Sequence, residues 1–370
     1  MRPGALAAVV AAAAVAGCGG GNDGGATSTA STAKTATAAA QSNKAAATPR
    51  PTVRQLIGQH MVYAYAGAEP PAGLVRRIRH GEAAGVILFD RNVGTLAHLR
   101  RTIARLQALP RAVDPGPLLI MVDQEGGPVR RVPGPPAASA AQTTTTAAAH
   151  ASGSAAGRLL HGAGVNVDLA PVVDVARPGS ALAAEGRTYG RDAKTVTARA
   201  GAFAAGLRDH GVAPVLKHFP GLGAATINTD DGAARVDLPL RTLRGVDLKP
   251  YEKTPDHAGL MVSTAIYPRV DPRPAVFSRR WVTTILRDGR PDVPTLTDDL
   301  QTPAVARYGS PAQLAYFALR AGIDVPLFAK TYGAGTSAAD GLLKAVRSGA
   351  LTRAQLQAGA DRLARWRAEL

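Results

Sequence analysis

Two short stretches of the chain combine residue types that perform nucleophilic and acid–base chemistry. Residues 217–221 read Lys-His-Phe-Pro-Gly and residues 297–299 read Thr-Asp-Asp, and each follows a short apolar run. Polar groups at the C-terminal ends of buried strands are where an α/β barrel places its chemistry. A carboxylate there is costly to bury unless it is paired or reactive. Two interpretations fit these residues alone: Asp298 is a nucleophile beside a substrate pocket containing Lys217 and His218, or the three form a strand-end salt bridge.

The elements that must position these residues are predicted from alternating apolar runs and helix-length segments. Segments of helical length cover 95–108, 193–209, 278–287 and 311–321. The runs, each with the length of a buried strand, cover 59–66, 85–89, 117–122, 164–175, 211–216, 259–266, 293–296 and 322–328. Eight strands alternating with helices predict an α/β fold, a single (β/α)8 TIM-type barrel. An open doubly wound sheet is the alternative, but residues 221–226 make a poor dinucleotide-binding loop.

The N-terminal region predicts export and lipid anchoring. Residues 5–16 form an unbroken run of twelve apolar residues, which is shorter than the roughly 20 needed to span a bilayer and suits a signal peptide. Residues 15–18, Val-Ala-Gly-Cys, resemble a bacterial lipobox, in which Cys18 would be lipidated. We therefore predict a lipoprotein signal peptide at 1–17, a flexible low-complexity tether at 18–51 and the barrel at 52–370. The predicted location is the outer face of the cytoplasmic membrane.

The formal net charge of the chain is +16. A basic surface can attract nucleic acid, anionic lipid or an acidic polymer. Nucleic acid is disfavoured by the predicted export and by the absence of a basic patch interleaved with aromatic residues. A solvated arginine-rich surface is the favoured explanation, and an anionic cell-wall polymer is a secondary one.

The residues that follow the predicted strands indicate which chemistry the barrel performs. Carboxylates, Arg, Lys and His occur there, at 90–92, 123–127, 185–190, 217–218 and 298–299. His218 has no second histidine at ligand spacing, so no metal is predicted, and no cofactor motif is present. Carboxylates with cationic donors suit a carbohydrate, because Asp accepts hydrogen bonds from hydroxyls and a second carboxylate attacks the anomeric centre.

Six motifs in the chain resemble glycoside hydrolase family 3, specifically its single-domain bacterial β-N-acetylglucosaminidases. They lie at 85–89, 123–131, 166–174, 187–190, 217–221 and 297–300, and the similarity covers about 53–370. The resemblance implies a retaining glycosidase that releases β-linked N-acetylglucosamine from peptidoglycan fragments, with Asp298 as the nucleophile. It also implies a sugar pocket made by Asp123, Arg131, Arg187, Lys217 and His218.

The chain departs from this family at the acid/base element. Members have Asp-Ser-His on a mobile loop, and this chain has Asn228-Thr229-Asp230 at the corresponding positions. Asp230 could be the acid/base if burial raises its pKa. Alternatively, the protein is a weak or inactive sugar-binding lipoprotein of the cell wall. Glucosidase or xylosidase specificity also stays open, whereas a two-lobed solute-binding lipoprotein is disfavoured by the single series of eight strands.

Overall fold

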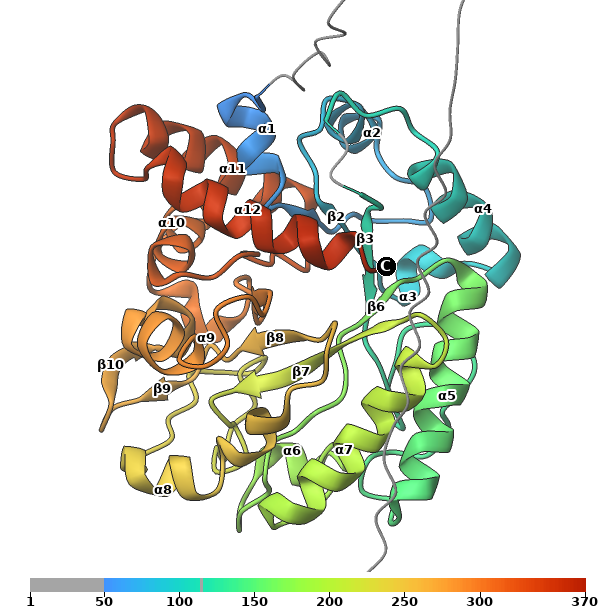
Figure 1. Ribbon diagram of the computed structural model, residues 1–370, viewed down its shortest axis with the longest axis vertical. Coiled ribbons are helices and arrows are strands. Elements are labelled where there is room, and N and C mark those ends of the chain that lie inside the picture. Colours follow the sequence, from blue (N-terminus) through green and yellow to red (C-terminus); the bar gives the residue numbers. More distant parts are fainter. Residues whose placement is uncertain (1–49, 114–115) are drawn as a thin grey trace, which may run out of the picture. The chain divides into compact units, whose positions relative to one another are not determined.

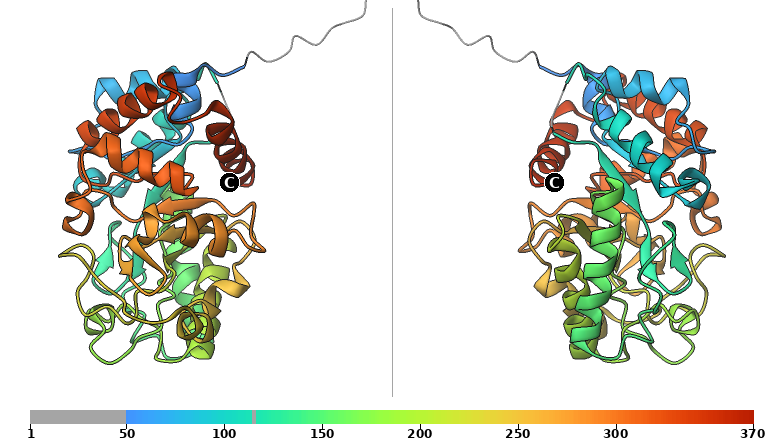
Figure 2. Two further views of the ribbon diagram at one scale, coloured as in Figure 1. Left: turned by 90° about the vertical axis from the view of Figure 1, so that its left-hand side faces the viewer. Right: turned by 90° about the vertical axis from the view of Figure 1, so that its right-hand side faces the viewer.

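The computed structural model describes residues 50–113 and 116–370 of the chain, and a curled parallel sheet is its central feature (Figure 1). Helices surround the sheet on its outer side in all three views (Figures 1 and 2). The predicted signal peptide, Cys18 and nearly all of the predicted tether lie outside the described residues. Among the described residues, none of the helices combines the length and apolar character needed to cross a bilayer.

The main sheet has seven strands, and every neighbouring pair is parallel. In spatial order the strands are β1 (Val62–Tyr63), β2 (Gly85–Ile87), β3 (Leu119–Val122), β6 (Val167–Asp168), β7 (Ala213–Phe219), β8 (Gly259–Val262) and β11 (Thr295–Thr297). Isolated parallel bridges pair Leu296 with Val325 and Phe328 with Tyr63. Residues 325–328 therefore take the eighth position and close the barrel between the last strand and the first. The predicted TIM-type barrel is confirmed.

Helices occupy the connections between successive strands, as expected for right-handed βαβ units. The helices that precede the third barrel strand are α1 (Val53–Gly58), α2 (Ala72–Arg79), α3 (Asp90–Val93) and α4 (Leu96–Gln107). Those between β3 and β8 are α5 (Thr146–Ala163), α6 (Ala181–Ala184), α7 (Ala193–Arg208), α8 (Leu240–Gly245) and the 3₁₀ helix η1 (Lys249–Lys253). The remaining ones are the 3₁₀ helix η2 (Ala275–Phe277), the π-helix η3 (Arg280–Leu286), α9 (Pro303–Ala306), α10 (Pro311–Ala321), α11 (Tyr332–Arg347) and α12 (Arg353–Arg367).

Two small antiparallel hairpins follow barrel strands at their carboxyl ends. One pairs β4 (Gln124–Gly126) with β5 (Val129–Arg130), and the other pairs β9 (Ile266–Tyr267) with β10 (Asp271–Pro274). The first hairpin follows the predicted strand at 117–122, and the second begins at the end of the predicted strand at 259–266. Alternating apolar runs do not reveal such hairpins, because their residues are too few to show a period.

Helices α5 and α7 pack side by side on the outside of the barrel (Figure 1). Glycines make this close approach possible. A Cβ at Gly153 would stand 2.0 Å from the carbonyl oxygen of Phe203, and a Cβ at Gly206 would stand 2.3 Å from that of His150. Both positions therefore exclude any larger residue, which explains glycine in the middle of two helices despite its low helix propensity.

A buried carboxylate joins three elements at the amino end of the barrel. Asp324, which is fully buried, precedes the eighth strand. One of its oxygens accepts hydrogen bonds from the Thr295 backbone N–H and from Arg287, both at 2.9 Å. The other accepts from Arg362 of α12 at 2.6 Å. The C-terminal helix is thereby tied to β11 and to the chain segment that follows η3.

We predict that Asp324→Asn destabilises the domain by about 3–5 kcal/mol, because it leaves two largely buried guanidinium groups without their counter-charge. The free energy of unfolding, from urea denaturation, measures the loss. The matched control is Asp292→Asn, which breaks the solvent-exposed pair between Asp292 and Arg365 and should cost about 1 kcal/mol or less. Equal losses in the two variants would show that the Asp324 network contributes no more than a surface ion pair.

Candidate active site

A cavity of about 440 Å³ lies at the carboxyl ends of the barrel strands and collects the residues predicted for the sugar pocket. Asp123 follows β3, Lys217 and His218 belong to the end of β7, and Asp298 follows β11. The residues with ionisable side chains that line the cavity are Arg91, Asp123, Glu125, Arg131, Glu185, Arg187, Lys217, His218, Asp230, Asp298, Asp299 and Lys330. Every predicted site residue of the barrel therefore lines one cavity.

Lys217 is the centre of a buried ion network on one side of this cavity. Its Nζ lies 2.7 Å from Asp123 Oδ1 and 2.7 Å from Glu125 Oε1. Arg187 donates two hydrogen bonds to Glu125, at 2.9 and 2.8 Å. Burial alone would raise the pKa of Glu125, but the charges of Arg187 and Lys217 hold that pKa well below its usual range. The four side chains are therefore held in place by one another before any substrate arrives.

His218 is oriented by a second buried carboxylate. Its Nδ1 lies 2.8 Å from Asp174 Oδ2, and Asp174 also accepts hydrogen bonds from the backbone N–H groups of His218 and Leu222. The carboxylate places a proton on Nδ1, which leaves Nε2 for a partner in the cavity. Asp174 itself is fully buried and does not line the cavity, so its role is to fix His218 and the start of the loop after β7.

Both oxygens of the Asp298 carboxylate accept hydrogen bonds. The backbone N–H of Asp299 donates to Oδ1 at 2.8 Å, and the hydroxyl of Thr229 donates to Oδ2 at 3.1 Å. The neighbouring Asp299 is mostly used for structure, since its carboxylate accepts from the backbone N–H groups of Gln301 and Ala329. Burial raises the pKa of Asp299 to about 6. Asp298 thus lines the cavity with both of its carboxylate oxygens held by donors.

Asp230 lies at the mouth of the same cavity, on the loop that follows β7. Its side chain keeps contact with solvent. Partial loss of hydration and, after that, the negative charge of Asp298 raise the pKa of Asp230, against the lowering effects of His218 and Arg187. Such a shift favours the protonated form, which is the form a general acid needs.

Asn228 fixes the position of this loop. Its Oδ1 accepts a hydrogen bond from the backbone N–H of Asp230 at 3.1 Å, and its Nδ2 donates to Glu185 Oε1 at 2.8 Å. The other oxygen of Glu185 accepts from Arg187 at 3.0 Å. The loop is thus connected, through Glu185, to the arginine of the buried ion network. We call this chain of hydrogen bonds from Asn228 through Glu185 to Arg187 the loop latch.

Arg131 completes the opposite wall of the cavity. Its guanidinium lies over the ring of Phe89, 5.5 Å from the ring centroid, and its buried Nε has no hydrogen-bond partner among the described residues. Next to this wall, Asp168 accepts a hydrogen bond from the backbone N–H of Gln124 at 2.9 Å. Burial raises the pKa of Asp168 to about 8, so this carboxyl group is neutral at pH 7 and does not line the cavity.

Three functional residues were not among those predicted from the sequence: Glu125, Glu185 and Thr229. Glu125 is the shared partner of Lys217 and Arg187. Glu185 stands two residues before Arg187, which was a usable signal. The contact of Thr229 with Asp298 spans 69 residues and no spacing rule indicates it. Among the described residues, no group of three or more His, Cys, Asp or Glu side chains is arranged to bind a metal.

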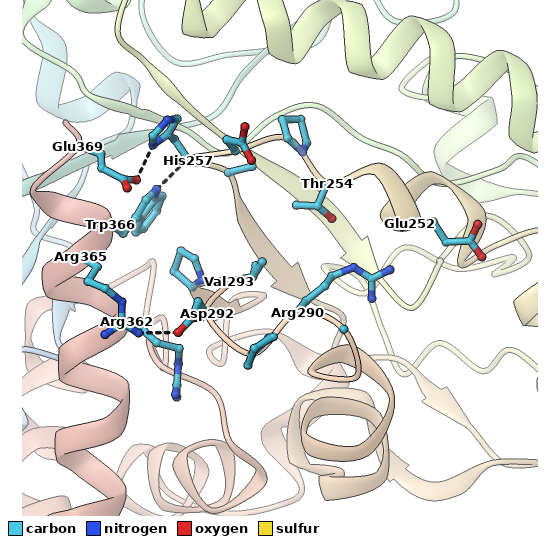
Figure 3. A pocket seen from close by; sticks show the side chains of 16 residues that line it. Glu252, Thr254, His257, Arg290, Asp292, Val293, Arg362, Arg365, Trp366 and Glu369 are labelled. Atoms are coloured by element: carbon cyan, nitrogen blue, oxygen red, sulfur yellow. Dashed lines mark hydrogen bonds and ion pairs between the residues drawn. The ribbon is translucent and has the colours of Figure 1, made fainter. Parts of the chain in front are cut away.

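A larger cavity, of about 720 Å³, lies at the amino ends of β8 and β11 (Figure 3). It lies between the turns that precede these strands and α12. Two ion pairs lie within its lining, Arg365 with Asp292 and His257 with Glu369. Barrels of this type place their chemistry at the carboxyl ends of the strands, whereas this cavity lies at the amino ends. It is therefore not the active-site candidate.

Comparison with known proteins agrees with the geometry of the carboxyl-end cavity. Residues 52–366 match the Glycosyl hydrolase family 3 N terminal domain. A β-hexosaminidase of Xanthomonas oryzae is 33% identical over 277 residues, which are 71% of this chain and 81% of that protein. An uncharacterized secreted glycosyl hydrolase of Arthroderma benhamiae is 34% identical over 323 residues, 83% of this chain and 90% of that protein.

Two solved structures have the same barrel. The β-N-acetylhexosaminidase of Beutenbergia cavernae has 30% identity and a TM-score of 0.77, and the match covers 86% of this chain and 98% of that one. A glycoside hydrolase family 3 β-N-acetylglucosaminidase from Paenibacillus has 27% identity and a TM-score of 0.80, with 86% and 62% covered. The present chain thus spans less than two thirds of the Paenibacillus protein. Its closed barrel, its carboxyl-end cavity and the match over nearly the whole described domain show that the chain belongs to glycosyl hydrolase family 3.

Proposed function

We propose that the protein is a retaining glycoside hydrolase that releases β-linked N-acetylglucosamine from peptidoglycan-derived glycans. The observation that supports this most directly is the pairing of Asp298 and Asp230 in one cavity. Asp298 is held by two hydrogen bonds, and its charge helps to raise the pKa of Asp230. Two carboxyl groups in one site, one to attack the anomeric carbon and one whose raised pKa suits a proton donor, are what a retaining glycosidase requires.

In the first step, a carboxylate oxygen of Asp298 attacks the anomeric carbon while the bond to the leaving oxygen breaks. Asp230 gives its proton to that oxygen, and the sugar becomes an ester of Asp298. In the second step, Asp230, now ionised, takes a proton from water, and the resulting hydroxide displaces Asp298 from the anomeric carbon. The N–H of Asp299 and the hydroxyl of Thr229 orient Asp298 for attack. They donate hydrogen bonds to it again when it is released as a carboxylate.

The buried ion network recognises the sugar. Asp123 has one oxygen on Lys217, so its second oxygen is available for a sugar hydroxyl. The Nε2 of His218 and the guanidinium of Arg131 provide further contacts from two other sides. The preference for N-acetylglucosamine is supported by the names of the relatives in Xanthomonas, Beutenbergia and Paenibacillus. Turnover of aryl β-glucoside or β-xyloside in preference to the N-acetylglucosaminide would reassign the sugar.

The peptidoglycan context and the lipid anchor at Cys18 stay predictions. Cys18 lies outside the described residues, and no comparison bears on where the chain is located. The alternative of a sugar-binding protein without activity differs from the proposal in one respect: whether Asp230 transfers a proton. The kinetic experiments below separate the two.

We predict that Asp298→Ala abolishes turnover of aryl β-N-acetylglucosaminides, because the carboxylate that attacks the anomeric carbon in the proposed mechanism is removed. A 5-fluoro glycosyl inactivator should esterify Asp298 in the wild type, and peptide mass spectrometry identifies the labelled residue. Asp299→Asn is the matched control, and its labelled residue should still be Asp298. A label on any other carboxylate would refute the assignment of the nucleophile.

We predict that Asp230→Ala slows substrates with poor leaving groups by about 10²–10⁴-fold, the usual contribution of a general acid. Activated aryl glycosides, which need no proton, should lose much less in the first step. Azide should restore turnover and give the β-glycosyl azide. In the wild type, the rate requires protonated Asp230, so it is highest below the raised pKa of Asp230 and falls as the pH increases through that pKa. This basic limb should disappear in the variant.

The control for this experiment is Asp231→Ala, which removes an exposed carboxylate from the same loop that does not line the cavity. It should keep both the leaving-group dependence and the pH profile of the wild type. An equal loss on all substrates in Asp230→Ala, without rescue by azide, would show that Asp230 only shapes the loop.

The loop latch gives a further prediction. Asn228→Ala removes the hydrogen bonds to Glu185 and to the Asp230 backbone, so we expect a decrease in kcat of about tenfold, the equivalent of one or two hydrogen bonds. The decrease should be larger for poor leaving groups, with KM nearly unchanged, because Asp230 and not the sugar pocket is misplaced. Thr226→Ala, at an exposed position of the same loop, is the control. A change in KM alone would indicate that Asn228 contacts the sugar.

A further inference from the structure

A hollow lined by aromatic and arginine side chains lies outside the active site. It has a volume of about 340 Å³ and shares no lining residue with the active-site cavity. We call it the aromatic hollow, and its lining residues are Arg273, Phe277, Arg279, Tyr308, Tyr316, Phe317, Arg320 and Ala321. They come from β10, η2, the turn before η3, the segment after α9, and α10. Packing of α10 and β10 against η2 brings these segments together.

The aromatic rings form a continuous row. Tyr308 lies 5.6 Å from Phe277, Phe277 lies 5.9 Å from Phe317, and Phe317 lies 5.7 Å from Tyr316, measured between ring centroids. The chain has only 2 Trp, 8 Tyr and 6 Phe in 370 residues. Four aromatic rings in one hollow are therefore many for a chain with so few aromatic residues. Phe317 is 37% exposed, and it belongs to this contiguous row of rings, which is the kind of apolar surface that marks a binding site.

The charge around the rings has one sign. Three arginines and no carboxylate line the hollow. Arg320 lies over Tyr316 and donates to its hydroxyl at 2.9 Å, and Arg273 pairs with Asp271. Arg279 is exposed and has no hydrogen bond or ion pair within the described part of the chain. A guanidinium fork without a protein partner is suited to a carboxylate, sulfate or phosphate group of a ligand.

We propose that the aromatic hollow binds an anionic glycan strand, separately from the active site. The C–H face of a sugar ring packs on Phe317 and Tyr308, while an acidic substituent is bound by Arg279 and Arg320. A purely apolar partner would leave these guanidinium groups unpaired, and a neutral glycan would not use them. In a glycosidase, such a site would keep the enzyme on a polymer while the active-site cavity receives chain ends.

The test measures binding of the full chain to hyaluronan oligosaccharides, in which N-acetylglucosamine alternates with glucuronate, by isothermal titration. The Asp298→Ala background prevents hydrolysis. Adding Phe317→Ala and Arg279→Ala together should weaken binding by about tenfold or more, as expected for the loss of an aromatic anchor with its arginine. Arg279→Ala alone should also lower the salt dependence of the affinity. Turnover of a small aryl glycoside should be unchanged when Phe317→Ala and Arg279→Ala are made in the wild-type enzyme, which also verifies folding.

The matched control combines Leu96→Ala with Arg158→Ala, a partly exposed apolar residue and an exposed arginine on other helices. This variant should bind hyaluronan like its parent.

Unchanged binding in the Phe317/Arg279 variant would overturn the proposal. If neutral chitohexaose bound as tightly as hyaluronan and this binding depended on Phe317, the ligand would be a neutral glycan and the proposal would be overturned. Tighter binding of oligothymidylate would also overturn it, because the ligand would then be a nucleic acid. A dimer in sedimentation velocity that the Phe317 substitution disrupts would assign the hollow to self-association instead. Because binding is measured directly, these results do not depend on whether Asp230 is the acid/base.

Discussion

The active site depends on the cost of burying charge at the ends of the barrel strands. Lys217, Glu125 and Arg187 are almost completely enclosed, and each would be unstable there alone. Their positions are therefore determined by one another: Lys217 must reach two carboxylates and Arg187 must meet Glu125 with both of its donors. Because these opposite charges fix one another in place, the site is formed before a ligand binds. Pre-organised recognition of a sugar requires such a site.

The same network extends to the loop after β7. Glu185 connects Arg187 to Asn228, and Asn228 in turn fixes the backbone of Asp230. Arg187 and the loop that carries Asp230 are therefore coupled through Glu185 and Asn228. In the family that the chain resembles, a histidine oriented by an aspartate stands on this loop. Here an amide takes the aspartate's place and orients a carboxylate, with Glu185 as the outer partner.

The barrel and the residues at its rim were predictable from the sequence, because both depend on short-range patterns. Apolar runs at regular spacing define the strands, and the motifs that contain Asp123, Lys217 and Asp298 place those residues directly at strand ends. The contact of Thr229 with Asp298 and that of Glu185 with Asn228 were not predictable, since they depend on how an irregular loop returns to the barrel. The eighth strand position was also predictable only in part. Its apolar residues were evident in the sequence, whereas closure of the barrel through Val325 and Phe328 depends on the curvature of the whole sheet.

The exposure of Asp230 has a consequence for the reaction. A general acid needs a raised pKa, which burial provides, and the second step needs water beside the same group. Asp230, at the mouth of the cavity, is both partly buried and accessible to water. Its pKa is raised by the surrounding protein and by Asp298, yet its side chain still contacts solvent. In the proposed mechanism, a substrate that covers the mouth would remove more water and strengthen the repulsion between the two carboxylates, which would raise the pKa of Asp230 further when a proton is needed. Departure of the leaving group would readmit water. Formation of the proposed ester would remove the negative charge of Asp298, so the pKa of Asp230 would fall and Asp230 could act as a base. Partial exposure of Asp230 would thus serve both of its proposed roles.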